Sequence, residues 1–575
     1  MTTMIGPESL LVALALLTAV TFPRLGATWF AKAERICGEL ARMPRMSVLV
    51  CGFLALSLRL AVLPLLPVPV PFIQDEFSYL LAADTFANGR LTNPTPPMWK
   101  HLETFHVIYE PTYASKYPPM QGLVLAAGRV IGGRPAAGVW VSVAVMCAAI
   151  CWMLQAWLPP GWALLGGLLA VLRIGVFSYW DNSYWGGAVA AIGGALVLGA
   201  LPRLKQGCRV RQALLMALGL GILANSRPYE GLLLAVPVAV ALLLWMAGKK
   251  RPPIRTLMLR VVLPITLTLC IIAAGTGYYF WRVTGSPTRM PYQVNQDRYA
   301  AARYFIWQSP NPPPLYRHKV ISDYYLKAEL AHHLETRTLT GFLEETGLKA
   351  LRTWLFYIGP ALTIPLFALP WVLHDRRTKW LLITGGISLI GSAFTTLFFP
   401  HYVAPLACLI LATVLQAMRH QRAWRLDDRP VGLFLVRSTV VVCALMVPLQ
   451  LFTLCVRSKS GEEQPGMPRE RILSELSSLP GRQLAIVRYR ADHAVLAPDW
   501  VDNDADIDNS KLVWARDMGP AQNEELLRYY KDRQVWLLDA DDTTPRLVPY
   551  PCEVNARSAG VPPETQTGAG EYRCQ

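Results

Sequence analysis

Long apolar runs separated by short polar segments dominate this chain. Twelve of them are close to the length that a helix needs to cross a bilayer, about 17–25 residues, and they cover residues 6–22, 47–66, 136–157, 161–177, 184–201, 211–225, 230–247, 257–280, 351–373, 379–398, 402–418 and 431–455. A further run, 120–131, is too short to cross and predicts a juxtamembrane or re-entrant helix. The pattern predicts an α-helical polytopic membrane protein with about twelve transmembrane helices.

After residue 455 the pattern changes to that of a soluble domain. Helix, strand, strand, helix and strand are predicted over residues 469–479, 483–489, 511–515, 523–532 and 534–539. This order favours a small α/β sheet, whereas residues 554–575 predict a loose tail. The chain is therefore divided into 1–46 (N-terminal helix and loop), 47–455 (transmembrane domain) and 456–575 (α/β domain with tail).

Charge then gives the expected sidedness. The chain is 53% hydrophobic and 16% charged, below the roughly 25% of charged residues in soluble proteins. A net charge of +16 would suggest a nucleic-acid partner in a soluble protein. Here the lysines and arginines cluster in alternate loops, so membrane topology explains them better and no nucleic acid is expected. The positive-inside rule puts the loop 23–46 in the cytoplasm and predicts that 67–135, 281–350 and 456–575 lie outside.

The predicted outer segments carry nearly all of the unusual polar residues. Asp75 and Glu76 come soon after the run 47–66, and two adjacent carboxylates at a membrane face are costly enough to need a reason. Asp75 could serve as a base, and Glu76 could position an acceptor or tune Asp75. The alternative is structural, with the pair capping the helix predicted over 80–89.

Cations stand in other segments of the same predicted side. Lys116 and Arg227 are candidate ligands for a phosphate group. Arg227 could instead pair with Glu230 or snorkel to lipid headgroups. Arg59, inside the run 47–66, could face a lipid phosphate or pair with a carboxylate.

Aromatic and polar residues at further membrane edges are candidates for substrate contacts. His401 and Tyr402 could donate to the same phosphate, or anchor their helix at the interface. Asp181 and Asn182 could bind sugar hydroxyls while Trp185 stacks on a ring. An aromatic belt explains the tryptophan equally well.

Two metal motifs are incomplete, and one cysteine pair stands out. The alternating aspartates of residues 502–508 lack the glycine and glutamate of an EF-hand in any register. His101 and His106 do not have the helical spacing of a zinc pair, so no metal or cofactor is expected. Cys552 and Cys574 lie in polar sequence on the predicted outer side, so we predict a disulfide between them, with two free thiols as the alternative.

The order of these motifs resembles the C-type (GT-C) glycosyltransferase superfamily, in particular bacterial relatives of the protein O-mannosyltransferases and the lipid A aminoarabinose transferases. Those proteins carry an Asp-Glu pair in the first outer loop, then a helix ending near Asn-Gly, then a Lys-Pro-Pro element. Here the corresponding motifs are Asp75-Glu76, Asn88-Gly89 and Lys116-Tyr117-Pro118-Pro119, with Tyr117 as an extra residue. The resemblance covers residues 47–455.

The resemblance implies a transferase in the bacterial inner membrane that takes a sugar from a polyprenyl-phosphate carrier without a metal. Asp75, with Glu76 beside it, would be the catalytic base of an inverting transfer. The donor phosphate-binding set would be Lys116, Arg227, His401 and Arg59. The substrate-binding set would be Tyr79, Tyr117, Asp181, Asn182, Trp185, Tyr229 and Tyr402.

Two other classes of protein stay open from the sequence. A transporter or flippase should show inverted repeats with Gly/Pro-broken helices in both halves, and we find no such repeat. A receptor that senses through its outer domain is the third class. Convergence of Asp75, Lys116 and Arg227 on one cavity would favour the transferase.

Overall fold

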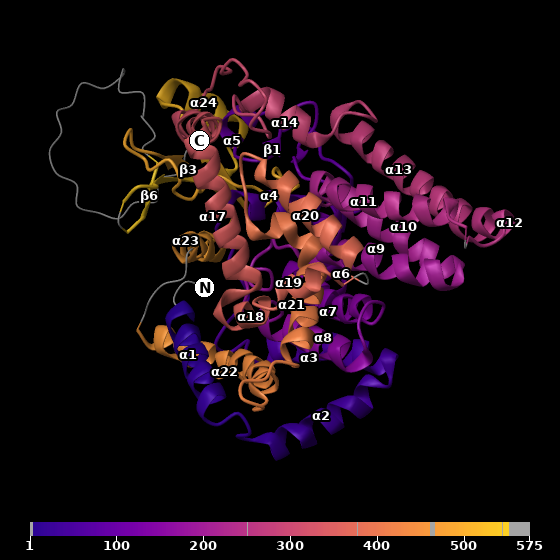
Figure 1. Ribbon diagram of the computed structural model, residues 1–575. Coiled ribbons are helices and arrows are strands. Elements are labelled where there is room, and N and C mark those ends of the chain that lie inside the picture. Colours follow the sequence, from indigo (N-terminus) through magenta and orange to yellow (C-terminus); the bar gives the residue numbers. More distant parts are fainter. Residues whose placement is uncertain (1–3, 250, 376–377, 461–465, 543, 551–575) are drawn as a thin grey trace, which may run out of the picture.

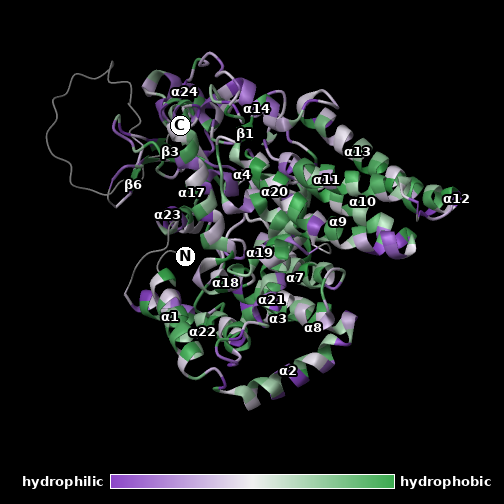
Figure 2. Cartoon of the chain, viewed as in Figure 1, coloured by the Kyte–Doolittle hydropathy of each residue, from purple (hydrophilic) through white to green (hydrophobic). Residues whose placement is uncertain are grey.

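Helices form most of the structure. The computed structural model describes residues 4–249, 251–375, 378–460, 466–542 and 544–550. Figure 1 shows a helical bundle with a small sheet at one end, and in Figure 2 many of the bundle helices are strongly hydrophobic. The apolar helices are α1 (Ile5–Thr21), α3 (Pro44–Ala61), α7 (Pro135–Leu154), α8 (Pro160–Arg173), α9 (Ala188–Gly207), α10 (Val210–Ala224), α11 (Pro228–Ala247), α13 (Leu263–Thr284), α20 (Lys379–Ala393), α21 (Ala407–Gln421) and α22 (Val431–Lys459).

Among the described residues, seven helices are long and apolar enough to cross a membrane. They are α3, α7, α9, α11, the stretch Ile254–Thr284, the stretch Pro400–Gln421 and α22. The first stretch joins α12 (Ile254–Leu257), η2 (Met258–Val262) and α13, and the second joins η4 (Pro400–Leu406) and α21. The shorter apolar helices α1, α8, α10 and α20 fall on four further predicted runs. The chain is therefore an integral multi-pass membrane protein, as predicted.

The run 351–373 is not one spanning helix, and the prediction is wrong there. It is divided among three helices, α17 (Leu339–Tyr357), α18 (Gly359–Leu366) and α19 (Leu369–Leu373). Gly359 has a φ of +61°, a conformation that glycine adopts at little steric cost. Pro360 follows it and has no N–H to continue the helical ladder. The start of the run instead belongs to α17, which already begins at Leu339.

Small residues let the helices next to the polar segments pack closely. The helix α6 (Pro119–Gly132), predicted as a short juxtamembrane helix, contacts both α4 (Gln74–Ala87) and α7. A Cβ on Gly122 of α6 would lie 2.7 Å from the Cβ of Ala82 in α4. A Cβ on Gly138 of α7 would lie 2.2 Å from a backbone oxygen of α6. Both contacts therefore need glycine, as membrane helix interfaces often do, and they fix α4 against the bundle.

The two long polar segments are folded. Segment 67–135 contains α4, α5 (Trp99–Leu102) and the antiparallel strands β1 (Val107–Ile108) and β2 (Ala114–Ser115). Segment 281–350 contains α14 (Pro291–Tyr299), α15 (Lys319–Asp323), the π-helix η3 (Tyr324–Leu330) and α16 (Ala331–Thr336). Figure 1 shows β1 and α14 at the same end of the molecule as the sheet. The chain thus gathers its polar segments around the start of α4.

The C-terminal region is a small α/β domain, as predicted. Its elements are α23 (Met467–Ser478), β3 (Arg482–Arg488), β4 (Leu512–Arg516), α24 (Pro520–Tyr529), β5 (Arg533–Asp539) and β6 (Leu547–Pro549). The strand order is β4-β3-β5-β6, in which the first three strands are parallel and β6, which the sequence did not predict, is antiparallel. Leu484, Ile486 and their neighbours in β3 are fully buried, as expected for a central parallel strand.

The segment 23–46, predicted as a loop, contains the helix α2 (Ala27–Ala41). Trp29 is 79% exposed and Ile36 is 61% exposed, so α2 turns apolar side chains away from the bundle. Figure 1 shows α2 at the end of the molecule opposite to the C-terminal sheet. Its short apolar repeat at helical spacing is broken by charged residues, which hid the helix in the sequence.

Candidate functional site

Asp75 and Glu76 lie in the first turn of α4. This helix begins at Gln74, six residues before the start of the helix predicted over 80–89. The preceding residue, Ile73, is extended, and the helix starts at Gln74. Carboxylates are favourable here because the N-terminus of a helix carries partial positive charge. The two side chains nevertheless have different surroundings.

Glu76 anchors the start of α4. Its side chain is buried, and its Oε2 accepts hydrogen bonds from the backbone N–H groups of Phe72 (2.9 Å) and Ile73 (3.0 Å). Its Oε1 accepts from the backbone N–H of Tyr184 (2.9 Å), which precedes α9. Burial raises the pKa of Glu76, and these three N–H groups act against that shift. Both oxygens are occupied by the backbone, so Glu76 has the capping role rather than a free catalytic oxygen.

Asp75 points to a different set of groups. Its side chain is 23% exposed, and Tyr117 donates a hydrogen bond to its Oδ1. The Nδ1 of His106 lies 3.6 Å from the same oxygen and 3.2 Å from the Tyr117 hydroxyl oxygen. The ring of Tyr117 stacks on Tyr79 at 4.3 Å. Within the described residues no hydrogen bond reaches Oδ2, so one oxygen of Asp75 is held and the other is open.

His106 is a neutral partner in this network. Burial and the positive charge of Lys116 lower the pKa of His106 to about 3, whereas Asp75 acts in the opposite direction. A neutral imidazole can hydrogen-bond to Tyr117 and Asp75 without neutralising the carboxylate.

Lys116 and Arg227 approach the same place from different elements. The Nζ of Lys116 lies 5.4 Å from the ring centre of Tyr117 and 6.0 Å from that of Tyr292. The guanidinium of Arg227, at the start of α11, lies 4.2 Å over the ring of Tyr402. Tyr117 and Tyr292 meet edge to face at 5.4 Å, and the positive charge of Arg227 acts on Tyr292 and on Tyr79, which stacks on Tyr117.

Neither cation forms a salt bridge in the part of the chain that the structure describes. The expected alternative for Arg227, an ion pair with Glu230, is therefore absent there. Burial lowers the pKa of Lys116, which Asp75 and Glu329 counteract from longer range. Lys116 and Arg227 are thus basic groups without an ion-pair partner among the described residues, close to a carboxylate with one open oxygen.

The sequence missed four of the groups around Asp75 as site residues. They are His106, Tyr292, Tyr324 and Glu329. Glu329 lies on the π-helix η3, is hydrogen-bonded to Tyr324 and acts electrostatically on Lys116. π-helical turns often occur at functional sites, but no short sequence motif predicts a π-helical turn. The only signal was the length of segment 281–350, typical of a functional loop.

Arg59 and Asp181 do not join this site, contrary to the sequence prediction. The Arg59 Nε lies 3.3 Å from Asp181 Oδ2, and each side chain is 1% exposed. Arg59 also donates to the carbonyl oxygens of Leu66 (3.0 Å) and Pro67 (3.2 Å) and stacks on Trp140. The pair therefore joins α3 to two loops, and neither member has surface left for donor phosphate or sugar.

Three other predicted residues are internal supports. The Asn182 side chain donates to the backbone oxygens of Val176 and Ser178, which closes its own loop. His401 is buried, bonds through Nδ1 to the Tyr179 hydroxyl (2.8 Å), and packs on Trp185 at 4.8 Å. These contacts give His401 and Trp185 a packing role instead of the expected substrate contacts.

The two remaining tyrosines differ from each other. Tyr229 donates its hydroxyl to the Gly391 carbonyl (2.9 Å) and packs on Phe305, so it links α11 to α20. Tyr402 supports Arg227 and stays at the site.

Cys552 and Cys574 lie outside the described residues, so the predicted disulfide stays a prediction. In the described ranges no group of three or more His, Cys, Asp or Glu side chains is arranged to hold a metal ion.

Known proteins provide a comparison for this fold. No protein-family model matches the sequence, and no curated protein matches it. The structure is similar to that of ArnT from Cupriavidus metallidurans in the apo state, which is 13% identical, with 90% of this chain and 94% of that chain covered and a TM-score of 0.50. Two further similar structures have lower scores. They are ArnT bound to undecaprenyl phosphate (13% identity, 85% and 91% coverage, TM-score 0.48) and the apo Archaeoglobus fulgidus oligosaccharyltransferase (10%, 77% and 62%, 0.43).

The fold is similar to that of apo ArnT over most of both chains. The similarity to apo ArnT extends over the C-terminal region as well as the helical bundle, because it covers 90% of this chain. At 13% identity this similarity establishes the fold alone. The activity must be argued from the site.

Proposed function

We propose that this protein is a membrane glycosyltransferase that moves a sugar from a polyprenyl-phosphate-linked donor to an acceptor at the outer face of the membrane. The observation that carries the proposal is the gathering of Asp75, Lys116 and Arg227 around neighbouring tyrosines: Tyr117 contacts Asp75 and Lys116, and Tyr292 contacts Lys116 and lies within the electrostatic reach of Arg227. ArnT, which has this fold, has been seen bound to undecaprenyl phosphate. A lipid-linked sugar phosphate needs the same combination of a base, phosphate-binding cations and a position beside the membrane.

Asp75 is the base in this proposal. Its open Oδ2 takes the proton from an acceptor hydroxyl while the hydroxyl oxygen forms a bond to the anomeric carbon of the sugar. The bond from that carbon to the phosphate oxygen breaks, and its electron pair leaves with the phosphate. Tyr117 and His106 hold Oδ1, so the base keeps one orientation during the transfer.

Lys116 and Arg227 stabilise the leaving phosphate. Each is a cation without a salt-bridge partner among the described residues, and charge that develops in the transition state is best met by groups already in place. Tyr402 supports the face of the Arg227 guanidinium, which leaves its N–H edge for phosphate oxygens. No metal ion is part of this mechanism.

The sugar is expected among the remaining half-buried groups of the site. The charge of Glu329 acts on Tyr304 and Tyr324, and Tyr292 packs edge to face against Tyr304. Aromatic faces and a carboxylate suit a ring with several hydroxyl groups. The acceptor and the identity of the sugar are left open by these residues.

The proposed orientation places this site and the C-terminal domain outside the cytoplasm, in a bacterial inner membrane. Lys32 and Arg35 of α2 belong to the basic loop 23–46, and α2 lies at the end opposite to the C-terminal sheet. Such a loop faces the cytoplasm by the positive-inside rule. Accessibility labelling of a cysteine introduced at the exposed Leu496 would test the orientation from intact cells.

A reconstituted transfer assay tests the function against the transporter alternative. Proteoliposomes with the purified chain would receive polyprenyl-phosphate donors carrying labelled sugars, together with extracts of candidate acceptors. The proposal expects label in a new covalent product and unlabelled polyprenyl phosphate left behind. If intact donor moved across the bilayer and no donor gave such a product, the protein would be a flippase instead.

A further inference from the structure

The short segment of residues 103–105 joins α5 to His106 and is buried along its whole length. Thr104 donates a hydrogen bond from Oγ1 to Asp499 Oδ2 at 2.9 Å. Arg516 donates from Nε to the Glu103 carbonyl oxygen at 2.6 Å, and its guanidinium lies 6.0 Å from the Phe105 ring centre. The C-terminal domain thus contacts each residue of this segment, across almost four hundred positions of sequence.

The two contacting residues form a buried ion pair at the carboxyl edge of the C-terminal sheet. Arg516 is the last residue of β4, and Asp499 lies in the connection from β3 to β4. Their side chains are 2% and 3% exposed, and Tyr489 also donates to Asp499. A buried pair gives a domain little stability over an apolar replacement. Two hydrogen bonds join this pair to residues 103–105, outside the domain. The pair can therefore position that segment.

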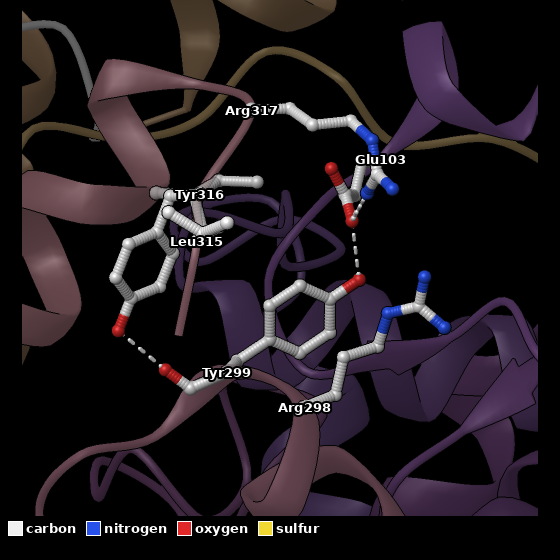
Figure 3. A pocket seen from close by; sticks show the side chains of 7 residues that line it. Glu103, Arg298, Tyr299, Leu315, Tyr316 and Arg317 are labelled. Carbon is white, nitrogen blue, oxygen red and sulfur yellow. Dashed lines mark hydrogen bonds and ion pairs between the residues drawn. The ribbon is translucent and has the colours of Figure 1, made fainter. Parts of the chain in front are cut away.

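The same segment is held from the other side by segment 281–350. Figure 3 shows the Glu103 carboxylate between Tyr299 and Arg317. Tyr299 donates its hydroxyl to Glu103 at 2.7 Å, and Arg317 lies 3.4 Å from the same oxygen. His318 lies 3.6 Å from the other carboxylate oxygen. Residue 103 is therefore fixed through both its backbone and its side chain.

The next residue is the histidine of the Asp75 network. His106 has a φ of +61°, a left-handed conformation that costs a residue with a Cβ free energy unless its surroundings impose it. Ser78 of α4 donates to the His106 carbonyl oxygen at 2.7 Å. Phe105 packs against Tyr324 at 4.9 Å. The position of the His106 ring against Asp75 therefore depends on how firmly residues 103–105 are held.

The C-terminal domain also holds α4, which carries Asp75. The Asp84 carboxylate accepts a hydrogen bond from the backbone N–H of Ala505 at 2.8 Å. The guanidinium of Arg469 lies 4.7 Å from the ring centre of Phe77, two residues after Asp75. Both sides of the Asp75–His106 contact are thus attached to one small domain.

We propose that the C-terminal domain is a clamp for the site, in which Arg516 and Asp499 act as positioning residues that keep His106 against Asp75 and Tyr117. This inference rests on the proposed function, since it assigns the domain a part in the same transfer reaction. The domain then serves the base directly and need not bind the acceptor.

Three variants test the clamp. Arg516→Gln removes the ion pair and the bond to residue 103, whereas Thr104→Val removes only the bond to Asp499 and keeps the side-chain shape. Arg488→Gln is the matched control, because Arg488 forms a half-exposed pair with Asp539 at the same sheet edge and is not bonded to residues 103–105 among the described contacts. Backbone deuterium exchange in residues 103–108 should become faster in the first two variants and stay unchanged in the third.

The transfer reaction supplies the second readout. Arg516→Gln should lower kcat by up to about 100-fold, as misplacement near a reacting group can do, while the KM for donor changes less than about threefold because Lys116 and Arg227 are intact. Thr104→Val should show the same split with a smaller loss. Equal changes in kcat and in the KM for donor would overturn the positioning role.

The pH profile separates positioning from general support. The groups that face the His106 ring are Asp75 from α4, Lys116 and Tyr117 after β2, and Tyr324 from η3. A loosened segment admits water, and the pKa of His106 then moves from about 3 toward its ordinary 6.5. Activity of Arg516→Gln and Thr104→Val should therefore fall between pH 7 and pH 5.5 more steeply than wild type.

The outcomes distinguish the clamp from the function on which it rests. Deuterium exchange needs no donor, so unchanged exchange in both Arg516→Gln and Thr104→Val overturns the clamp whatever the wild-type chain transfers. Faster exchange with wild-type kcat and pH profile also overturns it, because the contact would then be structural only. If Arg516→Gln fails to fold, Thr104→Val still decides. A wild-type chain that transfers no sugar overturns the proposed function instead.

Discussion

Of two acid–base arrangements in this protein, only one is open. Arg59 and Asp181 are each 1% exposed and pair with one another at 3.3 Å. Asp75 is 23% exposed, and the cations that share its surroundings, Lys116 and Arg227, form no salt bridge within the described residues. The buried pair is satisfied within the protein, whereas the charges around Asp75 can still act on a bound group, as the proposed function requires.

Breaking the buried pair should give the largest effect, and on stability. Arg59→Met leaves Asp181 buried without its cation, which should cost about 3–5 kcal/mol of unfolding free energy. The double variant Arg59→Met with Asp181→Leu should recover most of that loss, because it removes both charges. Thermal unfolding in detergent measures it. If Arg59→Met melted at the wild-type temperature, water would still reach the pair, and this prediction would be wrong.

The two free cations should instead affect donor binding. Lys116→Gln and Arg227→Gln should each weaken binding of undecaprenyl phosphate by roughly 10- to 150-fold, the worth of a hydrogen bond to a charged group. Arg227→Lys should rescue poorly, because lysine lacks the planar fork that stacks on Tyr402.

The matched control for these cations is Arg289→Gln. Arg289 pairs with Asp297 at 2.8 Å and is half exposed, so its loss should leave lipid binding unchanged. Equal weakening in this control would mean that net charge, rather than the two named cations, attracts the lipid phosphate.

The third variant sharpens the role of the residue inserted between Lys116 and Pro118. Tyr117→Phe keeps the ring on Tyr79 but removes the hydroxyl that holds Asp75. Turnover should fall by about tenfold, with donor binding unchanged. Tyr229→Phe is the control, since its hydroxyl reaches only the Gly391 carbonyl within the described chain. Turnover measured side by side would contradict the role if both variants behaved alike.

The last effect is a pH dependence of stability. The pKa of His106 is about 3 in the folded chain and 6.5 when unfolded. The unfolded chain therefore takes up the proton first, and folded stability falls as the pH drops below 6.5, by at most about 1.4 kcal/mol per pH unit.

His106→Gln should remove this acid sensitivity. Its melting temperature should decline less than that of wild type between pH 6.5 and pH 4.5, while the exposed His374→Gln follows wild type. A wild-type slope in His106→Gln would show that His106 is reached by protons in the folded chain.

Much of the fold could be predicted from the sequence because hydrophobic period and length are local signals. Eleven apolar runs and the strands β3 to β5 follow from them. The break at Gly359 within the run 351–373 was missed because composition outweighed its glycine and prolines. The helix α2 was missed because charged residues mask its apolar face.

The site could be predicted only in part, since its contacts join distant parts of the chain. Asp75, Lys116 and Arg227 were found because a charge at a membrane edge stands out alone. Tyr117 and Asp75 are 42 positions apart, and their hydrogen bond has no local pattern. The same limit led Arg59 to be placed at the site, since the sequence does not show that Asp181 is its partner.

The role of Asp75 as the base is tested most directly by single-turnover sugar transfer with Asp75→Asn at saturating donor. The transfer rate is normalised to the amount of bound undecaprenyl phosphate. The rate should be lower than that of wild type by about 100- to 10,000-fold, the usual contribution of a general base, while the melting temperature and lipid binding stay those of wild type. A transfer rate near that of wild type in this correctly folded, donor-binding variant would contradict the account.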